Sequence, residues 1–314
     1  MDVSRAKDEA DLRGLMFSIA YRMTGSVSEG EDLVQEAYFR YERARQSGVA
    51  VESPKAYLAA TTTRLAIDLM TSARVRRESY VGTWLPEPIV ADLHEGPEHM
   101  AELSDALSMA FLVLLESLSP VERAVFLLRE VFDYDYEEIA RIVEKSEANC
   151  RQIFVRARRH LDAHHARYEA STEQNEALLR SFLSATRDGD LEQLVDLLAA
   201  DAMFCGDGGG KATAIAQPLY GGEQIAARLL AYFDRVRSLG VAGEPVLVNG
   251  GPGIVYRDRH GDIVSVLSLE VIDGAVQTLR SVVNPDKLGH LGAVSDLLRT
   301  RPEDDDPEPR AAIP

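Results

Sequence analysis

Two short consecutive helices expected between residues 133 and 161, DYDYEEIARIVEKSEANCRQIFVRARRHL, constrain the fold more than any other part of the sequence. Asp135 can cap the first helix, and Glu138 three residues later completes a capping box. Ser146 can cap the second helix, which is apolar on one side and basic on the other. Two short helices of which the second presents arginine and glutamine outward predict a helix-turn-helix that reads DNA.

The outward side of that second helix carries the side chains that we expect to contact DNA. Arginine can bond guanine or phosphate through its planar fork, and glutamine can do the same for adenine. Residues 141–167 hold seven Lys or Arg against three Asp or Glu, within a chain of net charge −17. An ordinary solvated helix, whose basic residues favour the C-terminal end of the helix dipole, is the alternative interpretation. The predicted contacts are Arg151, Gln152, Val155, Arg156, Arg158 and Arg159.

Two upstream segments carry further candidate surfaces. In residues 57–80, YLAATTTRLAIDLMTSARVRRESY, aromatic and basic residues occur together, as in proteins that bind single-stranded nucleic acid. We expect Leu58, Leu65, Ile67 and Leu69 in the core and Arg64, Asp68, Arg74, Arg76 and Arg77 exposed. Residues 31–44 predict an amphipathic helix whose outward face is either solvated or a docking surface. That face carries Asp32, Gln35, Glu36 and Arg40.

The first half of the chain reads as helical, with no convincing strand before residue 200. Helix starts are expected at the Ser28 capping box, at Ser53-Pro54 and at Ser119-Pro120. Prolines and glycines interrupt the pattern within residues 81–97, VGTWLPEPIVADLHEGP. We therefore expect two all-α domains, over residues 1–82 and 101–168, joined by a linker over 83–100.

After residue 170 the pattern changes to that of an α+β domain, which we place over residues 172–290. Helices are expected near 173–186, 191–199 and 223–236, followed by strands over 245–248, 254–257, 263–272 and 275–283. Turns containing glycine separate these strands, so an antiparallel meander with helices on one face is predicted. Residues 291–314 end in an acidic, proline-rich stretch and are expected to be a disordered tail.

The composition excludes several classes of protein. No stretch reaches the roughly 18 apolar residues that a membrane span needs, and no signal peptide is evident. The two cysteines have no zinc-ligand spacing and cannot build a disulfide framework, so a cytoplasmic location is expected. No cofactor and no metal are expected.

The sequence DGGGKA, residues 207–212, looks at first like a phosphate-binding loop. A Walker-type loop needs G-x-x-x-x-G-K-[ST], but Cys205 stands at the first glycine and Ala212 follows the lysine. Nucleotide binding is therefore not expected, and the motif is either a flexible surface loop or part of a larger signature.

Three blocks, in this order and spacing, resemble an extracytoplasmic-function (ECF) RNA polymerase sigma factor: SVSEGEDLVQEAYFRY, TRLAIDLMTSARVRRESY and LSPVERAVFLLREVFDYDYEEIARIVEKSEANCRQIFVRARRHL. The resemblance covers roughly residues 8–165. It implies that Asp32, Gln35, Glu36 and Arg40 contact the clamp of core RNA polymerase. It also implies that residues 64–77 meet the minus-10 element of promoter DNA and that residues 151–159 read the minus-35 duplex.

Three further motifs, WLPEP at 84–88, DGGGKA at 207–212 and NPDKL at 284–288, resemble the signature of SigJ-like sigma factors with a SnoaL-like C-terminal extension. The resemblance implies a cone of the nuclear-transport-factor-2 type that regulates the sigma half in cis. We expect Trp84 to dock in apolar surface of the extension. The polar contacts of that interface are expected from Asp207, Lys211, Asn284, Asp286 and Lys287.

Two alternatives stay open at the level of sequence. The chain can be a stand-alone helix-turn-helix regulator whose SnoaL-like domain binds a small-molecule ligand or catalyses a reaction. Candidate cavity residues for such chemistry are Asp207, Tyr220, Tyr256 and His290. Nothing in the sequence pairs a base with an orienting partner, so we do not expect an enzyme.

Overall fold

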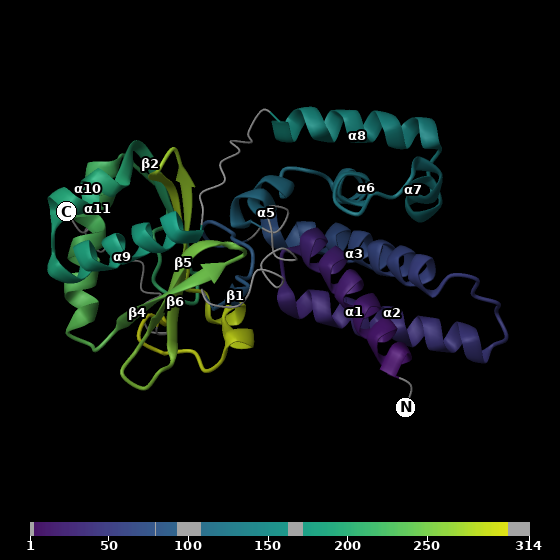
Figure 1. Cartoon of the computed structure of the whole chain (residues 1–314), viewed down its shortest axis with the longest axis horizontal. Coiled ribbons are helices and arrows are strands. Elements are labelled where there is room, and N and C mark those ends of the chain that lie inside the picture. Colours follow the sequence, from purple (N-terminus) through teal and green to yellow (C-terminus); the bar gives the residue numbers. More distant parts are fainter. Residues whose placement is uncertain (1–2, 79, 93–107, 163–171, 301–314) are drawn as a thin grey trace.

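The computed structural model describes residues 3–78, 80–92, 108–162 and 172–300. Figure 1 shows a helical half at one end of the molecule and an α+β domain at the other, with the segment after residue 80 running between them. Residues 93–107 and 163–171 lie outside the described residues. They include the second part of the expected linker and the expected end of the second helical domain.

Three helices form the first part: α1 (Val3–Thr24), α2 (Val27–Gln46) and α3 (Pro54–Glu78). The predicted start of α2 was wrong by two residues, because Ser26 is the N-cap and accepts from the backbone N–H of Glu29. Ser28 lies inside the first turn. On α3, Leu58 is buried as expected, but Leu65 and Ile67 are only partly buried. The buried stripe follows the spacing of small residues and threonines instead, through Ala59, Thr62, Thr63, Ala66 and Met70.

Four helices form the second part: α5 (Met109–Leu115), α6 (Pro120–Glu130), α7 (Tyr136–Val143) and α8 (Glu147–Asp162). The capping boxes at Ser119 and Asp135 are confirmed. Glu144 ends α7 in the left-handed conformation (φ 55°), and Ser146 accepts from the N–H of Asn149 at the start of α8. The predicted helix-turn-helix is therefore present, with α8 as its second helix.

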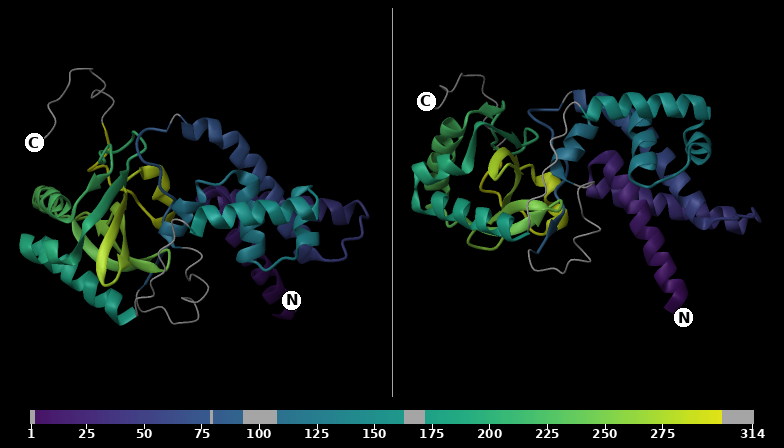
Figure 2. Two further views of the ribbon diagram at one scale, coloured as in Figure 1. Left: turned by 90° about the horizontal axis from the view of Figure 1, so that it is seen from above. Right: turned by 45° about the horizontal axis from the view of Figure 1, so that its top comes forward.

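The two helical parts lie side by side and share one hydrophobic core (Figure 2). Buried Arg123 on α6 donates to the carbonyl oxygen of Met23 on α1 at 2.6 Å and to Glu116 at 2.7 Å. The guanidinium of Arg22 lies 5.4 Å from the ring centre of Phe132. Arginines therefore join α1 to the segment that contains the helix-turn-helix.

The C-terminal domain is built on a mixed sheet whose strand order is β1-β4-β5-β6-β7-β2-β3. The four predicted strands are β4 (Ala242–Val248), β5 (Gly251–Arg257), β6 (Ile263–Ile272) and β7 (Ala275–Val282), and they form the expected antiparallel meander. Asn249 and Asp273 have φ of 53° and 51°, each followed by a glycine of positive φ, as these tight hairpin turns require.

Three strands were not predicted. β2 (Leu198–Asp207) pairs in parallel with β7, β3 (Leu219–Tyr220) lies at one edge, and β1 (Val90–Ala91) at the other. The helix expected to reach residue 199 ends earlier, as α10 (Leu191–Leu197). β2 escaped prediction because its side chains do not alternate cleanly between apolar and polar.

Each face of this sheet is covered. The helices α9 (Thr172–Asp188), α10 and α11 (Gly222–Arg237) pack on one face around Phe182 and Leu229. The apolar cluster on strand residues such as Val255 and Val266 also contains Leu85 of the linker and Met109 of α5. The C-terminal domain therefore contacts both the linker and the second helical part.

The expected tail is partly ordered. The N–H of Ile263 donates to the carbonyl of Ala293, and the N–H of Thr213 donates to that of Leu298. The expectation of disorder from residue 291 was wrong up to residue 300, because it rested on the acidic composition of the last fourteen residues. Those residues, 301–314, lie outside the described part of the chain.

Candidate interdomain site

The linker segment 80–91 crosses from the helical half to the C-terminal domain and is held on both sides. Residues 85–88 are buried, and β1 adds to the edge of the sheet, with Val90 opposite Val248 and Ala91 opposite Leu247. The main chain of Ile89 also exchanges hydrogen bonds with Asn249. The linker is therefore held by the C-terminal domain, and its residues Val90 and Ala91 form an edge strand of that domain's sheet.

Asp207, the first residue of DGGGKA, is fully buried at the end of β2. Its carboxylate accepts from the hydroxyl of Tyr80 at 2.5 Å, from the N–H of Leu85 at 2.8 Å and from Nζ of Lys287 at 2.6 Å. A buried carboxylate is stable only when it is paired and hydrogen-bonded in this way. Asp207 thus binds the linker through both a side chain and a main-chain group.

Lys287 of NPDKL sits at the centre of the same cluster. Its Nζ donates to the carbonyl of Leu85 at 2.5 Å and lies 4.1 Å from the ring centre of Trp84 and 5.0 Å from that of Tyr80. An ammonium over an aromatic face is attracted by the ring quadrupole, and more strongly when water is excluded. The buried ion pair of Asp207 and Lys287 therefore hydrogen-bonds both the N–H and the C=O of Leu85.

Trp84 lies against the helical half as well. A Cβ at Gly25, in the turn between α1 and α2, would lie 2.7 Å from Cη2 of Trp84, and Gly25 has φ 69°. Trp84 was expected to dock in apolar surface of the extension. Its ring packs between Gly25 and the Lys287 ammonium, so that it contacts both parts of the molecule.

The remaining motif residues divide into two groups. Nδ2 of Asn284 donates to the Tyr80 hydroxyl at 2.9 Å, which adds this residue to the linker contacts. Lys211 and Asp286 pair with each other, both more than half exposed, within the C-terminal domain. Asp286 adds to the rise in the pKa of Tyr80 that burial and Asp207 cause, so this pair lies beside the linker contact. Such pairs stabilise little in water.

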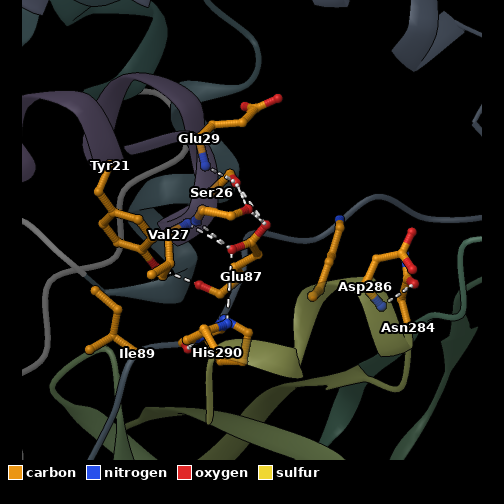
Figure 3. Close-up of polar contacts among 12 residues, drawn as sticks. Tyr21, Ser26, Val27, Glu29, Glu87, Ile89, Asn284, Asp286 and His290 are labelled. Atoms are coloured by element: carbon orange, nitrogen blue, oxygen red, sulfur yellow. Dashed lines mark hydrogen bonds and ion pairs between the residues drawn. The ribbon is translucent and has the colours of Figure 1, made fainter. Parts of the chain in front are cut away.

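Glu87 of WLPEP caps a helix from outside that helix (Figure 3). One of its carboxylate oxygens accepts from the N–H of Val27 at 2.7 Å and from the N–H of Ser28 at 3.2 Å, and the other accepts from the hydroxyl of Ser26 at 2.7 Å. A carboxylate at a helix N-terminus satisfies free N–H groups and favours the helix dipole. The start of α2 is therefore completed by the linker.

A second buried chain of hydrogen bonds joins the two parts beside Glu87. Nδ2 of Asn249 donates to the hydroxyl of Tyr21 at 2.7 Å, and that hydroxyl donates to the carbonyl of Glu87 at 2.6 Å. His290 contacts the carbonyl of Pro88 through Nε2 at 2.8 Å, and its Nδ1 lies 4.0 Å from a carboxylate oxygen of Glu87 (Figure 3). Sequence reasoning missed Tyr21, Glu87 and Asn249. Only Glu87 carried a signal, as the sole charged residue of WLPEP.

Burial fixes the protonation of the two tyrosines at this site. Burial raises the pKa of Tyr21, and burial together with the hydrogen bond to Asp207 raises the pKa of Tyr80. Both hydroxyls consequently keep their protons well above neutral pH and act as donors there. The two tyrosines therefore join the linker to both parts of the molecule as hydrogen-bond donors.

The four candidate catalytic residues do not come together. Tyr220 is 60% exposed on β3, whereas Tyr256 is buried in the core beneath α9 and α11. Asp207 and His290 are engaged with the linker. No group of three or more His, Cys, Asp or Glu side chains suited to a metal ion occurs in the ranges that the structure describes.

The predicted DNA and polymerase contacts lie on helix surfaces of the other half. The outward side of α8 is exposed, as is the face of α2 that carries Asp32, Gln35, Glu36 and Arg40. Arg64 and Asp68 are exposed on α3, and Arg64 also contacts α7. Arg74, Arg76 and Arg77 belong to α3, but their side chains lie outside the described structure.

Known proteins match both halves of this arrangement. Models of Sigma-70 region 2 and of Sigma-70, region 4 match residues 10–76 and 108–161. The ECF RNA polymerase sigma factor SigJ of Mycobacterium tuberculosis is 34% identical over 88% of this chain and 90% of its own length. This chain belongs to the ECF sigma factor family. It is also 30% identical to the probable ECF sigma factor SigI of the same species, over 90% of this chain and 93% of that protein.

The whole architecture is shared with a solved sigma factor. The crystal structure of Mycobacterium tuberculosis SigJ matches with a TM-score of 0.72 and 30% identity, over 90% of this chain and 98% of that one. The expected arrangement of two helical sigma domains followed by an α+β domain is confirmed. ECF sigma factors bind core RNA polymerase and promoter DNA to direct initiation and catalyse nothing themselves. The stand-alone regulator is not favoured, because the region 2 match accounts for residues 10–76.

Proposed function

We propose that the parts of this sigma factor divide promoter recognition and its control among them. The exposed face of α2 binds the clamp region of core RNA polymerase, α3 meets the minus-10 element, and α8 reads the minus-35 duplex. The exposure of the polar sides of α2 and α8 supports this assignment. The assigned DNA contacts are Arg64, Asp68, Arg74, Arg76 and Arg77 on α3 and Arg151, Gln152, Val155, Arg156, Arg158 and Arg159 on α8.

The C-terminal domain regulates the sigma half in cis by holding the linker. One observation carries this proposal: the buried pair of Asp207 and Lys287 bonds the main chain of Leu85 on both sides. Two residues later, Glu87 caps α2, the helix assigned to the polymerase. A change in the hydrogen bonds to Leu85 can therefore affect the start of α2 through only three residues, 85–87. The tether keeps the local concentration of the domain high, so a modest contact suffices.

In vitro transcription with core RNA polymerase tests both parts of the proposal. The template is the region upstream of the protein's own gene, and full-length protein is compared with a version that ends near Tyr168. Initiation that depends on the protein is expected, with a different rate for the shortened version. No initiation with either form, despite measured DNA binding, contradicts the assigned contacts. Equal rates contradict control in cis.

A small-molecule ligand of the C-terminal domain is a second candidate, and one observation favours it. The hydroxyl of Tyr256 is buried and has no hydrogen-bond partner among the described residues. A ligand with a hydrogen-bond acceptor would satisfy it. A screen for compounds that raise the melting temperature of the wild type but not of Tyr256→Phe tests this idea, and equal shifts in both proteins contradict it.

A cytoplasmic location follows from the proposed partners. Core RNA polymerase and promoter DNA lie in that compartment. Within the described part of the chain, no helix combines the length and the apolar character needed to cross a membrane. Cell fractionation tests the location, with recovery in the membrane fraction as the contrary result.

A further inference from the structure

The N-terminal half of α8 presents a mixed surface rather than a purely basic one. Val155 is 44% exposed on the same side as Gln152, three residues earlier, and Arg156 beside it. Residues three apart on a helix are neighbours. Val155 therefore places an apolar side chain between an amide and a guanidinium on the exposed side of α8.

Arg151 is restrained beside this surface. Its guanidinium pairs with Glu147 at 3.0 Å and lies 4.8 Å from the ring centre of Tyr136 on α7. Gln152 makes no hydrogen bond to any residue that the structure describes, so its amide is available to a base edge. On the exposed side of α8, Val155 and Gln152 are thus the uncharged side chains that we consider for contact with bases.

We propose that Val155 reads the 5-methyl group of a thymine in the minus-35 element, next to an adenine bonded by Gln152. Among the four bases only thymine carries a methyl group in the major groove, and adenine offers the N6/N7 pair that an amide bonds bidentately. This inference rests on the proposed role of α8. It adds that the helix distinguishes one A·T pair by an apolar contact, whereas arginine contacts favour guanine or phosphate.

Replacing thymine by uracil, which lacks the methyl group, tests the proposal. Promoters are first selected from a pool randomised over the minus-35 positions, using holoenzyme made with full-length protein. Each thymine of the selected element is then replaced singly by deoxyuridine. For the wild type, one replacement is expected to weaken binding about four-fold, the effect of one buried methyl group. Val155→Ala is expected to bind the thymine duplex about as weakly and to ignore that replacement.

The control variant is Val49→Ala, which truncates another exposed valine outside α8 and should respond to uracil as the wild type does. If wild type and Val155→Ala respond alike to uracil at every position, the inference fails while the assignment of α8 stands. If selection yields no minus-35 preference at all, the role proposed for α8 fails as well.

A different observation carries a second inference, about the contact between α3 and α7. Nε of Arg64 donates to the carbonyl of Ile142 at 2.9 Å, and Nη2 donates to that of Arg141 at 2.7 Å. The same Nη2 lies 3.7 Å from a carboxylate oxygen of Glu144. The last carbonyls of a helix lack partners within it and form the negative end of its dipole, so a guanidinium fits there.

We infer that Arg64 is a clasp that holds the two DNA-reading domains together, and that its bond to α7 and its contact with minus-10 DNA exclude each other. The guanidinium must leave both carbonyls before it can reach a nucleotide. Binding of the minus-10 strand therefore loosens region 2 from region 4. The clasp itself does not depend on the proposed DNA contacts, because it is defined by the two carbonyls.

Spin labels on the exposed residues Val49 and Lys145 report the separation of the two domains. Arg64→Gln is expected to increase the population of longer distances at least about threefold. Arg45→Gln serves as the control, because Arg45 is similarly exposed and contacts Glu42 and the ring of Tyr41, which both belong to its own helix. An unchanged distribution in Arg64→Gln would overturn the clasp. A minus-10 oligonucleotide that binds the wild type without lengthening the distances would overturn the mutual exclusion.

Discussion

At the scale of single residues, burial separates the two lysine–aspartate pairs that the sequence motifs bring together. Lys287 and Asp207 are 7% and 0% exposed, whereas the side chains of Lys211 and Asp286 are 57% and 59% exposed. Removing one partner of a buried pair leaves an uncompensated charge, while a solvated partner simply returns to water. The two pairs therefore serve as a matched comparison within one domain.

Lys287→Met is expected to lower the free energy of unfolding by about 3–5 kcal/mol. The loss arises because Asp207 stays buried without its countercharge and Leu85 loses a donor. Lys211→Met should change it by less than about 1 kcal/mol. Urea unfolding followed by circular dichroism and Trp84 fluorescence measures both. Equal losses in the two variants would show that the buried pair does not hold the linker.

Tyr80 predicts an alkaline limit for the same contact. Its folded-state pKa is raised above the ordinary value, first by burial and then by Asp207. The stability that its proton confers is therefore fully present below about pH 10 and is lost as pH rises through the folded pKa. The fall in unfolding free energy above pH 10 is expected to be smaller in Tyr80→Phe than in the wild type. In the control Tyr220→Phe, at an exposed position, the unfolding free energy should fall with pH as it does in the wild type. Identical curves for all three proteins contradict the prediction.

At the scale of elements, the linker connects two surfaces that carry different chemistry. β1 extends the sheet by main-chain pairing with β4, and Glu87 completes the N-terminus of α2. Between them, Tyr21 of α1 and Asn249 of the β4–β5 turn meet in one hydrogen-bond chain. The close approach of Trp84 to the α1–α2 turn depends on a glycine at position 25.

Gly25→Ala is expected to displace Trp84 and shift its fluorescence emission to the red. Both Gly25 and Gly48 have positive φ, so alanine adds roughly 1–2 kcal/mol of strain at either position. Only at position 25 does the new Cβ meet another side chain, which adds about 1–3 kcal/mol. Gly48→Ala is the control, since a Cβ there meets nothing within 4 Å. Indistinguishable emission spectra for the two variants would contradict the packing of Trp84 on this turn.

The sequence was sufficient for the elements whose signals are local. The capping boxes at Ser119 and Asp135, the hairpin turns and the meander depend on neighbouring residues, and all are found. The parallel strand β2 and the edge strand β1 depend on partners far along the chain, which no periodicity reveals. At the site, the gathering of Asp207, Asn284 and Lys287 around the linker was predicted through the motifs. Tyr21 and Asn249 were missed because one looks like a core residue of a helix and the other like a turn residue.

At the scale of the whole molecule, one acidic domain contacts the linker and two helices of the sigma half, α1 and α5. It binds the linker at Leu85, reaches α1 through Asn249 and covers Met109 of α5. Residues 172–314 hold 22 acidic and 13 basic residues, a net charge of −9. Removal of this domain therefore changes both the field around the basic helix α8 and the restraint on the linker, and salt separates these two effects.

Truncation near Tyr168 is expected to raise affinity for promoter DNA at low salt. If the acidic domain acts through its electrostatic field, the difference in DNA affinity between truncated and full-length protein should disappear as salt is added. Salt shortens the range of charge interactions to roughly 10 Å at 0.1 M and further at higher concentrations. If the domain acts by holding the linker, this difference in affinity should persist at high salt. Full-length Lys287→Met, which loosens the linker but keeps every acidic residue and loses one positive charge, should then also bind more tightly than wild type. Titrations of all three proteins across a salt series measure this. Unchanged affinity on truncation at low salt would refute shielding. A difference in affinity that persists at high salt, without any effect of Lys287→Met, would place the restraint on the contacts with α1 and α5 rather than on the linker.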